Sequence, residues 1–513
     1  MNNAKPITSA LPLMIGSYGP DQFGPVVENL FVNTDGFAIM FDQNRPTFIR
    51  RSEHSVCFSV YPKIPPSYGN GTRYTFLGLH LIATANIARA HHECVNHFNW
   101  IRKPVDKKTH HVHLPDERMF KLPTFNLDVK TLHQAQVLTR AHEIQKHGFK
   151  NAHLVLQNWE ANFGDLTFDK TRFPQPKSMI SELRHLGFIV KLVVHSFFSE
   201  KSIMFRKHHA LLISDVHNAS HPFIFSWPPH GRGGLFRYEP HPSILYWLPK
   251  ELNELRKETA VDSFKFIVEE IGQYGLPDNQ FRLNFNLSLS KHYANEFTKN
   301  QVTVAAKLGI LVEVDAGYQT QSQPVFVRMP DVDSSWNGLK SIITTALTMS
   351  IAGYSFMTPA VLKSGPNGTK PSEELYIRWI QTCTFLPSIQ LSTLSWTYSD
   401  KVANISKKYL DLHSEHSATI FNLARASAQR GKPLVRPLWY LAPDDAKTYP
   451  ISDQFAVGND IIVAPVLVQG QKERSVYLPH GNWVDQHGQS HSGPAQIKVL
   501  TPLEELAYFK RKF

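Results

Sequence analysis

Short buried strands alternating with helical segments decide the fold of this chain. The strands read NAHLVLQN (151–158), IVKLVVHSF (189–197), DSFKFIVEE (262–270) and ILVEVDAG (310–317). They are mostly apolar and rich in β-branched residues, which is typical of parallel strands covered on both faces. Segments with helical spacing fill the intervals, such as SMISELRHLGF (178–188) with its stop near Gly187. This alternation predicts an α/β fold, a (β/α)8 TIM barrel over residues 119–415.

The two ends of the chain have a residue pattern typical of β-strands, without the alternation seen in the barrel region. Residues 1–118 contain β-branched and aromatic runs such as GFAIMF (36–41), broken by Pro, Gly and Asn. Residues 416–513 contain QFAVGNDIIVAPVLVQ (454–469) and ERSVYLPH (473–480), separated by turn residues. We therefore predict an N-terminal and a C-terminal β-sandwich domain on either side of the barrel.

Composition excludes several classes of protein. The formal net charge is +11, but the basic residues are scattered, so we expect no nucleic-acid partner. No apolar run reaches the roughly 18 residues of a membrane span. Five Asn-x-Ser/Thr sequons weakly favour a luminal or secretory compartment, although the first residues predict neither a signal peptide nor an anchor. The sequons lie at Asn70, Asn218, Asn286, Asn367 and Asn404.

Motifs for cofactors and metals are missing from the sequence. It contains no P-loop, no ordered G-x-G-x-x-G and no G-x-S-x-G, so we expect no cofactor and no serine-hydrolase triad. The segment His91-His92-Glu93-Cys94 with His97 has metal-ligand residue types. It lacks the H-E-x-x-H spacing that places two histidines on one helix face, so we expect no metal site.

A series of motifs identifies a family resemblance over roughly three quarters of the chain. They include HLGFIVKLVVHSFF (185–198), SFKFIVEE (263–270), ELYIRWIQTCTFLPSIQLS (374–392) and DQFAVGNDIIVAPVLV (453–468). In this order they resemble glycoside hydrolase family 31. The resemblance implies a retaining α-glycosidase scaffold, in which two carboxylates about 5–5.5 Å apart flank the scissile bond.

The position of the family's nucleophile does not hold a carboxylate. The family's KFDAGE-like strand end reads Lys265-Phe266-Ile267-Val268-Glu269-Glu270, so Ile267 replaces the Asp. An aliphatic side chain cannot attack a sugar carbon, and Ile267 is expected to be a core residue. Glu269 is a possible rescue nucleophile, because residues two apart on a strand share a face, but it is displaced by roughly 6–7 Å.

The resemblance assigns the acid/base role to Asp331, five residues before Trp336, with Arg328 also kept. A lone carboxylate can bind a sugar hydroxyl but cannot run double displacement. The alternative is that Asp331 caps the helix that begins near Trp336.

Other sugar-binding positions have also changed. The family's Asp-Asp-x-Trp-Glu reads Leu156-Gln157-Asn158-Trp159-Glu160, where Trp159 is still able to stack on a sugar ring. Acidic residues are also lost at Tyr238-Glu239-Pro240 and at Pro359-Ala360-Val361-Leu362-Lys363-Ser364, the family's Pro-Asp-x-x-Gly-Gly. His195 is expected either to line the pocket or to be a satisfied core residue. Gln390 matches a Gln-x-Ser seen in part of the family and is a further substrate-binding candidate.

Three functions remain open from the sequence. The leading hypothesis is a pseudoglycosidase that binds a glycan or glycoconjugate in the barrel cleft, or a partner protein, without turnover. The second is a divergent active α-glycosidase of α-galactosidase or α-glucosidase type, with Asp331 as acid/base. The third is an interaction or maturation factor for an active paralogue, as a partner-binding protein or homodimer. Fold-level likeness cannot choose among them, because function resides in the site.

Overall fold

The structure is a computed structural model. It describes residues 28–41, 78–97, 113–214, 220–238, 242–267, 290–365 and 369–512, and shorter pieces at 11–12, 18–19, 22–23, 26, 48–51 and 56–59. The chain divides into two compact units, which are described separately. The first comprises Met1–Asn29, Phe41–His80 and Leu127–Val325, and the second comprises Leu30–Met40, Leu81–Asn126 and Phe326–Phe513.

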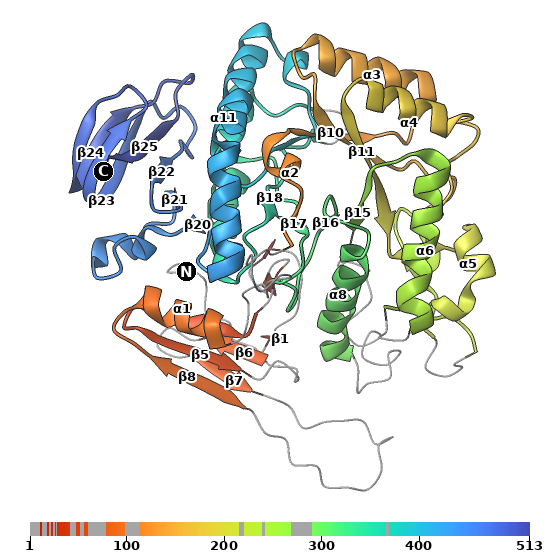
Figure 1. Cartoon of the computed structure of the whole chain (residues 1–513), viewed down its shortest axis with the longest axis horizontal. Coiled ribbons are helices and arrows are strands. Elements are labelled where there is room, and N and C mark those ends of the chain that lie inside the picture. Colours follow the sequence, from red (N-terminus) through yellow and green to blue (C-terminus); the bar gives the residue numbers. More distant parts are fainter. Residues whose placement is uncertain are drawn as a thin grey trace, which may run out of the picture. The chain divides into compact units, whose positions relative to one another are not determined.

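Four parallel strands form the centre of the first unit. They are neighbours in the order β10 (Ala152–Gln157), β11 (Phe188–His195), β15 (Ser263–Ile267) and β16 (Glu313–Val314). All eight residues of β11 are buried, as the apolar run predicts. The helices of this unit are α3 (Gln134–Lys146), α4 (Pro176–His185), α6 (Pro242–Thr259) and α8 (Ser290–Ala306), with α3, α4 and α6 beside β10 and β11 in Figure 1.

The turn between α4 and β11 requires a glycine. Gly187 has a φ of +89°, and a Cβ there would lie 2.2 Å from the carbonyl oxygen of Lys150. Only glycine avoids both the strained dihedral and this collision. The helix therefore stops where the sequence predicts.

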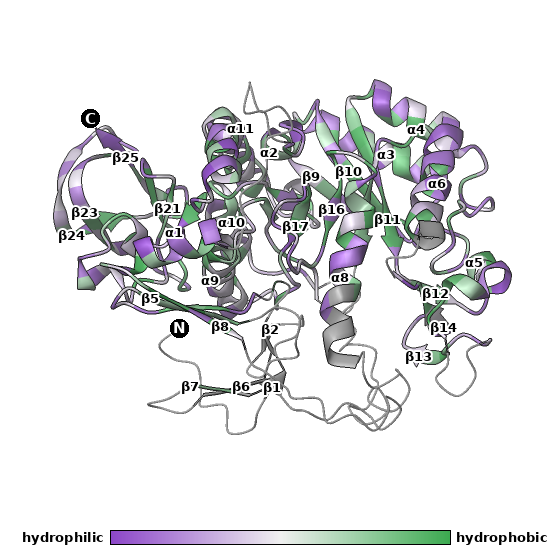
Figure 2. Cartoon of the chain, turned by 60° about the horizontal axis from the view of Figure 1, so that its bottom comes forward, coloured by the Kyte–Doolittle hydropathy of each residue, from purple (hydrophilic) through white to green (hydrophobic). Residues whose placement is uncertain are grey.

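A small antiparallel sheet follows β11. It consists of β12 (Phe197–Ser199), β13 (Phe225–Trp227) and β14 (Gly231–Leu235), with β14 in the middle. The five-residue helix α5 (Ile203–Lys207) and the 3-10 turn His209–Leu211 follow β12. Figure 2 shows these strands as a separate group beside α5. The loops at the carboxyl ends of β10 and β11 lead toward this sheet.

The second unit contains four more strands in parallel pairs. β17 (Phe326–Arg328) pairs with β18 (Met357–Thr358), and β19 (Gln390–Leu391) pairs with β9 (Thr124–Asp128). The accompanying helices are α9 (Trp336–Ile351), α10 (Glu373–Cys383), α11 (Asp400–Arg430) and the short α2 (Arg118–Lys121). Over both units the chain contains eight parallel strands, and helices separate most of them along the sequence, although β17 follows β16 without one. This is the predicted (β/α)8 fold.

The C-terminal strands form one antiparallel sheet in the order β20-β21-β22-β25-β23-β24. Their bounds are Val435–Arg436, Phe455–Val457, Ile461–Ala464, Glu473–Asp485, Ser490–Leu500 and Ala507–Lys512 for β20 to β25. Buried Trp483 and Phe509 lie in its core. The predicted boundary at residue 416 falls inside α11, which ends at Arg430 because Gly431 adopts the left-handed conformation.

The N-terminal region is rich in strands, as predicted, but it also contains a helix. The strands β4 (Leu30–Val32), β5 (Phe37–Phe41) and β8 (Leu79–Ala83) form one sheet, and β1 (Leu11–Pro12), β6 (Phe48–Arg51) and β7 (Val56–Ser59) form another. Helix α1 (Ile87–His97) packs Ala90 and Cys94 against Ala38 of β5. Sequence reasoning placed only strands here. The pair β2 (Tyr18–Gly19) and β3 (Gln22–Phe23) completes the described strands.

Helices long and apolar enough to cross a bilayer are not found among the described residues.

Candidate active site

The nucleophile position lies at the carboxyl end of β15. Ile267 is the last residue of the strand, is half-buried, and pairs in register with His195 of β11. Two residues earlier on the same strand, the ammonium of Lys265 lies 2.6 Å from a carboxylate oxygen of Glu313, and both side chains are buried. Lys265, the charged residue of β15 nearest to Ile267, is therefore already paired with the carboxylate of Glu313. Glu269, the predicted rescue residue, lies outside the described residues.

Asp331 is held between two cations. Arg328 donates from Nη1 to one carboxylate oxygen at 2.6 Å, and Lys363 donates from Nζ to the other at 2.5 Å. Burial raises the pKa of Asp331, but Arg328 and Lys363 outweigh it and lower that pKa to about 2. The carboxyl is therefore ionised throughout the neutral range.

This protonation state bears on the acid/base assignment. A general acid needs a proton to give, and its pKa works best near the operating pH. Lys363 occupies the first glycine position of the Pro-Asp-x-x-Gly-Gly motif implied by the family resemblance, so the second cation comes from a substitution. The capping alternative for Asp331 is wrong. Ser335 caps α9, where its hydroxyl accepts a hydrogen bond from the amide of Gly338 at 3.1 Å.

Trp159 is a core residue in this structure. Its side chain is 1% exposed, and its indole N–H donates to the carbonyl of Val193 at 2.8 Å. Its ring contacts Phe168 with centroids 4.7 Å apart. The predicted role in stacking on a sugar is therefore wrong for this conformation, because the ring faces are covered by protein.

His195 and Glu160 form a buried pair at the ends of β11 and β10. The Nε2 of His195 lies 3.8 Å from a carboxylate oxygen of Glu160. Burial raises the pKa of Glu160 to about 7 and lowers the pKa of His195 to about 3. His195 is thus neutral and enclosed, which favours the core alternative over the pocket-lining one.

Gln390 has both ends of its amide engaged by protein atoms. Its carbonyl accepts from Asn126 at 3.0 Å, and its N–H donates to the carbonyl of Pro359. The side chain is buried. Substrate contact by Gln390 therefore requires that these bonds be exchanged.

The substituted family positions are filled by buried side chains. Leu156 and Tyr238 are fully buried, and Ala360 is almost so. The ring of Tyr238 packs edge-on against Phe297 at 5.0 Å. Glu239 and Pro240 lie outside the described residues. At these positions the family resemblance implies acidic residues that would bind sugar hydroxyls. Leu156, Tyr238 and Ala360 have aliphatic or aromatic side chains there instead.

Sequence reasoning missed an aromatic cluster beyond the ends of β10 and β11. Phe163 lies between two imidazoles, with ring centroids 4.0 Å from His195 and 3.6 Å from His230. Trp227 lies 4.7 Å from His230 and 5.5 Å from Phe163. The signal in the sequence is the segment Trp227-Pro228-Pro229-His230. Its partner Phe163 is too distant in the chain for local patterns to reveal the cluster.

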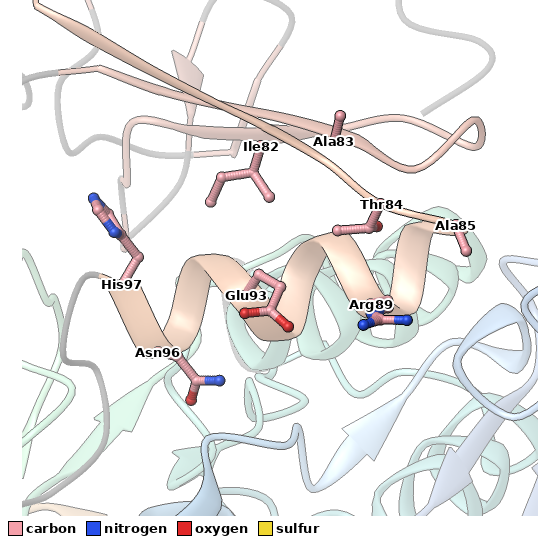
Figure 3. Close-up of a pocket in the computed structure, with 8 residues that line it drawn as sticks. All are labelled: Ile82, Ala83, Thr84, Ala85, Arg89, Glu93, Asn96 and His97. Atoms are coloured by element: carbon pink, nitrogen blue, oxygen red, sulfur yellow. The ribbon is translucent and has the colours of Figure 1, made fainter.

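A hollow of about 730 Å³ lies between β8 and α1, far in sequence from all predicted site residues. Figure 3 shows Ile82 pointing from the strand toward the helix, and the helix supplies Arg89, Glu93, Asn96 and His97. His91, on the same helix, is buried within 2.7 Å of the carbonyl of Ile351. In the part of the chain that the structure describes, no group of three His, Cys, Asp or Glu residues is arranged to hold a metal ion.

Comparison with known families decides the relationship. The model of the glycosyl hydrolases family 31 TIM-barrel domain matches residues 121–417. This chain belongs to glycosyl hydrolase family 31. The model of the glycosyl hydrolase family 31 C-terminal domain matches residues 431–512, which confirms the resemblance inferred from the motifs.

Individual relatives agree with this assignment. The myogenesis-regulating glycosidase of Mus musculus is 32% identical over 417 residues, which cover 77% of this chain and 57% of that protein. The SITS-binding protein of Tetronarce californica is 26% identical and covers 96% of this chain and 70% of that protein. The chain thus spans little more than half the length of the first relative.

Solved structures show the same fold. The Flavobacterium johnsoniae family 31 dextranase FjDex31A, complexed with glucose, matches with a TM-score of 0.79 at 19% identity, over 98% of this chain and 63% of that one. The cycloalternan-degrading enzyme of Trueperella pyogenes matches with a TM-score of 0.82 at 16% identity, over 98% of this chain and 77% of that one. At these identities the likeness concerns the fold alone.

Proposed function

We propose that this chain is a non-catalytic member of family 31 that binds a glycan or glycoconjugate without hydrolysing it. The observation that carries the proposal is the state of Asp331, which is ionised and held by Arg328 and Lys363. Ile267 at the nucleophile position supports it independently.

The chemistry of retention explains why both positions matter. Double displacement requires one carboxylate to attack the sugar carbon and a second carboxyl to protonate the leaving oxygen. Ile267 offers no electron pair for attack. Asp331, with a pKa of about 2, offers no proton at neutral pH. The missing nucleophile and the missing proton donor each prevent formation of the glycosyl-enzyme intermediate. Together they support the proposal that this chain has kept the barrel fold without the hydrolytic activity.

Binding of a sugar is proposed because of the fold. The FjDex31A structure of this family is complexed with glucose, and barrel proteins hold their ligands at the carboxyl ends of the strands. Thermal-shift measurements with maltose, isomaltose and melibiose test retained binding. A raised midpoint with one of them is expected. No change with any of them favours the alternative of a protein-binding or maturation factor.

Hydrolysis of aryl α-galactosides and α-glucosides tests the loss of catalysis. The chain is expected to release no more aryl alcohol than buffer alone. The matched variants are Asp331→Asn and Glu269→Gln. Turnover that Asp331→Asn abolishes overturns the proposal. If Glu269→Gln abolishes it too, Glu269 is identified as the substitute nucleophile of an active α-glycosidase.

A further inference from the structure

The hollow between β8 and α1 lies along the edge of a sheet. Among the described strands, β5 has neighbours on both sides, whereas β8 is paired with β5 alone. The amide of Thr84, directly after β8, donates to the carbonyl of Gly36 at 2.9 Å, which fixes the side of β8 that faces β5. Because successive peptide groups of a strand point in opposite directions, the N–H and C=O of Ala83 point away from β5. Ala83 lines the hollow, which therefore contains backbone groups of an edge strand.

Such backbone groups can pair with a further strand. An extended peptide adds to a sheet by hydrogen bonding to the N–H and C=O groups along its edge. In this mode the main-chain hydrogen bonds supply affinity, and the side chains around the edge supply specificity. The hollow has a volume of about 730 Å³, which is within the range of ligand sites. An extended peptide is therefore the ligand whose geometry fits this edge.

The exposed face of α1 carries charges of both signs along this hollow. Arg89, Glu93 and Asn96 recur at helical spacing, and Figure 3 shows them along one side of the helix. The opposite side of α1 packs Ala90 and Cys94 into the core. Arg89 is exposed and Glu93 is half-buried, and neither forms an ion pair with another residue of the described chain. Both charges are therefore available to a ligand.

The spacing of these two charges matches that of an extended peptide. Four residues along a helix advance by about 6 Å. Side chains two apart on an extended strand share one face and lie about 6.6 Å from each other. Figure 3 shows β8 running along α1 rather than across it, so a strand added to β8 follows the helix as well. An acidic and a basic side chain, two residues apart, can therefore lie opposite Arg89 and Glu93 at the same time.

The other face of the edge favours apolar residues. Ile82 points toward α1, so Leu81 and Ala83 lie on the opposite face of the sheet. Leu81 is 62% exposed, and Phe37 of the neighbouring strand is 46% exposed. An added strand places every second side chain on this face. An apolar side chain beside Leu81 removes apolar surface from water.

We propose that the outer edge of β8 and the charged face of α1 bind an extended peptide of a partner protein. The peptide alternates apolar residues with charged ones, and an acidic and a basic residue two apart face Arg89 and Glu93. The inference does not depend on the proposed glycan-binding function, because the residues that line this hollow precede the barrel domain in the chain.

Fluorescence anisotropy of the labelled peptide Thr-Val-Glu-Val-Lys-Val-Thr, titrated with the whole chain, tests the proposal. We expect a saturable rise in anisotropy. Ala83→Pro removes the outward amide and leaves the amide of Thr84 in place, so it should weaken binding about fivefold or more. The same peptide with N-methylated backbone amides cannot pair with a strand edge and should not bind.

Charge reversal tests the role of α1. Glu93→Lys leaves two cations on this face. It should weaken binding of the peptide about threefold, and it should strengthen binding of the same peptide with Glu in place of Lys. The matched control is Glu182→Lys, which changes the net charge equally at an exposed position of α4 and should leave both affinities unchanged.

The outcomes decide between pairing at this edge and other binding. A wild type that gives no saturable rise overturns the proposal, and so does binding that survives both Ala83→Pro and backbone methylation. Equal effects of Glu93→Lys and Glu182→Lys overturn the role of α1. Unfolding midpoints of the variants are measured in parallel. A switch of preference toward the doubly acidic peptide cannot result from unfolding, so Glu93→Lys tests the proposal even where Ala83→Pro is unstable.

Discussion

Replacement of Lys363 by methionine is expected to raise the pKa of Asp331. The pKa of this carboxyl falls from 3.8 to about 2 because Arg328 and Lys363 outweigh the effect of burial. Lys363→Met removes one of the two cations and one of the two hydrogen bonds while keeping a side chain of similar length. We expect the pKa to rise by roughly one pH unit, equivalent to about 1.4 kcal/mol between the two protonation states before solvent screening.

The effect on stability is smaller, because the pair is half-exposed. The side chains of Lys363 and Asp331 are 50% and 46% exposed, and ion pairs of this kind contribute about 0.2–1 kcal/mol. Asp331 has a depressed folded-state pKa. Its contribution is therefore present above its unfolded pKa near 4 and is lost as pH falls toward 2. The variant should lose less stability than the wild type over that interval.

Carbon-13 NMR of protein labelled at aspartate carboxyls measures this pKa directly. Asp331→Asn identifies the resonance by its disappearance. The control is Lys340→Met, which removes an equal charge from an exposed position of α9. Equal Asp331 pKa values in the wild type and Lys363→Met refute the argument that Lys363 holds this carboxyl ionised.

Three further outcomes follow from buried side chains. Because the pKa of Glu160 is raised to about 7, its stabilising contribution is present below pH 4.5 and is lost as pH rises through 7. The wild type should therefore lose up to about 3 kcal/mol of unfolding free energy between pH 5 and pH 8.5, measured by urea unfolding, and Glu160→Gln should not show this loss. Burial lowers the pKa of His413 to about 4, so the unfolded chain takes up the proton first and stability falls below pH 6.5; His413→Gln should flatten the decline between pH 6.5 and 4, and an unchanged slope would contradict this. Trp159→Ala should reduce the free energy of unfolding by about 3–5 kcal/mol, whereas a residue that served only to stack on sugar would leave unfolding unchanged.

The barrel was predictable because its strands are buried on both faces. The run around Val193 and Val194 contains few of the polar residues that a half-exposed strand carries, and Gly187 marks the preceding turn. The N-terminal helix was missed although its buried residues recur at helical spacing: Ile87, Ala90, His91, Cys94 and Val95. The strand-like runs around it in residues 1–118 outweighed this local pattern.

The sequence predicted which residues occupy the motif positions of the site, but not the contacts that those residues make. The loss of the Asp at Ile267 is visible in the strand sequence alone. The ion pair that keeps Asp331 charged is not visible there, because Lys363 is 32 residues away and meets Asp331 only after folding. Trp159 shows the opposite error. Its residue type suggested sugar stacking, while its contact with Val193 buries it. Exposure depends on tertiary packing, which a single sequence does not record.

The pairing of Lys363 with Asp331 bears on how hydrolysis, which we propose this chain has lost, is regained. Return of an aspartate at Ile267 restores the attacking group, but it leaves the proton donor ionised by Arg328 and Lys363. Loss of Lys363 alone frees the carboxyl without a nucleophile to serve. Neither single step yields turnover on which selection can act. Under the proposed function, hydrolysis is therefore expected to return only when Ile267 and Lys363 are both replaced.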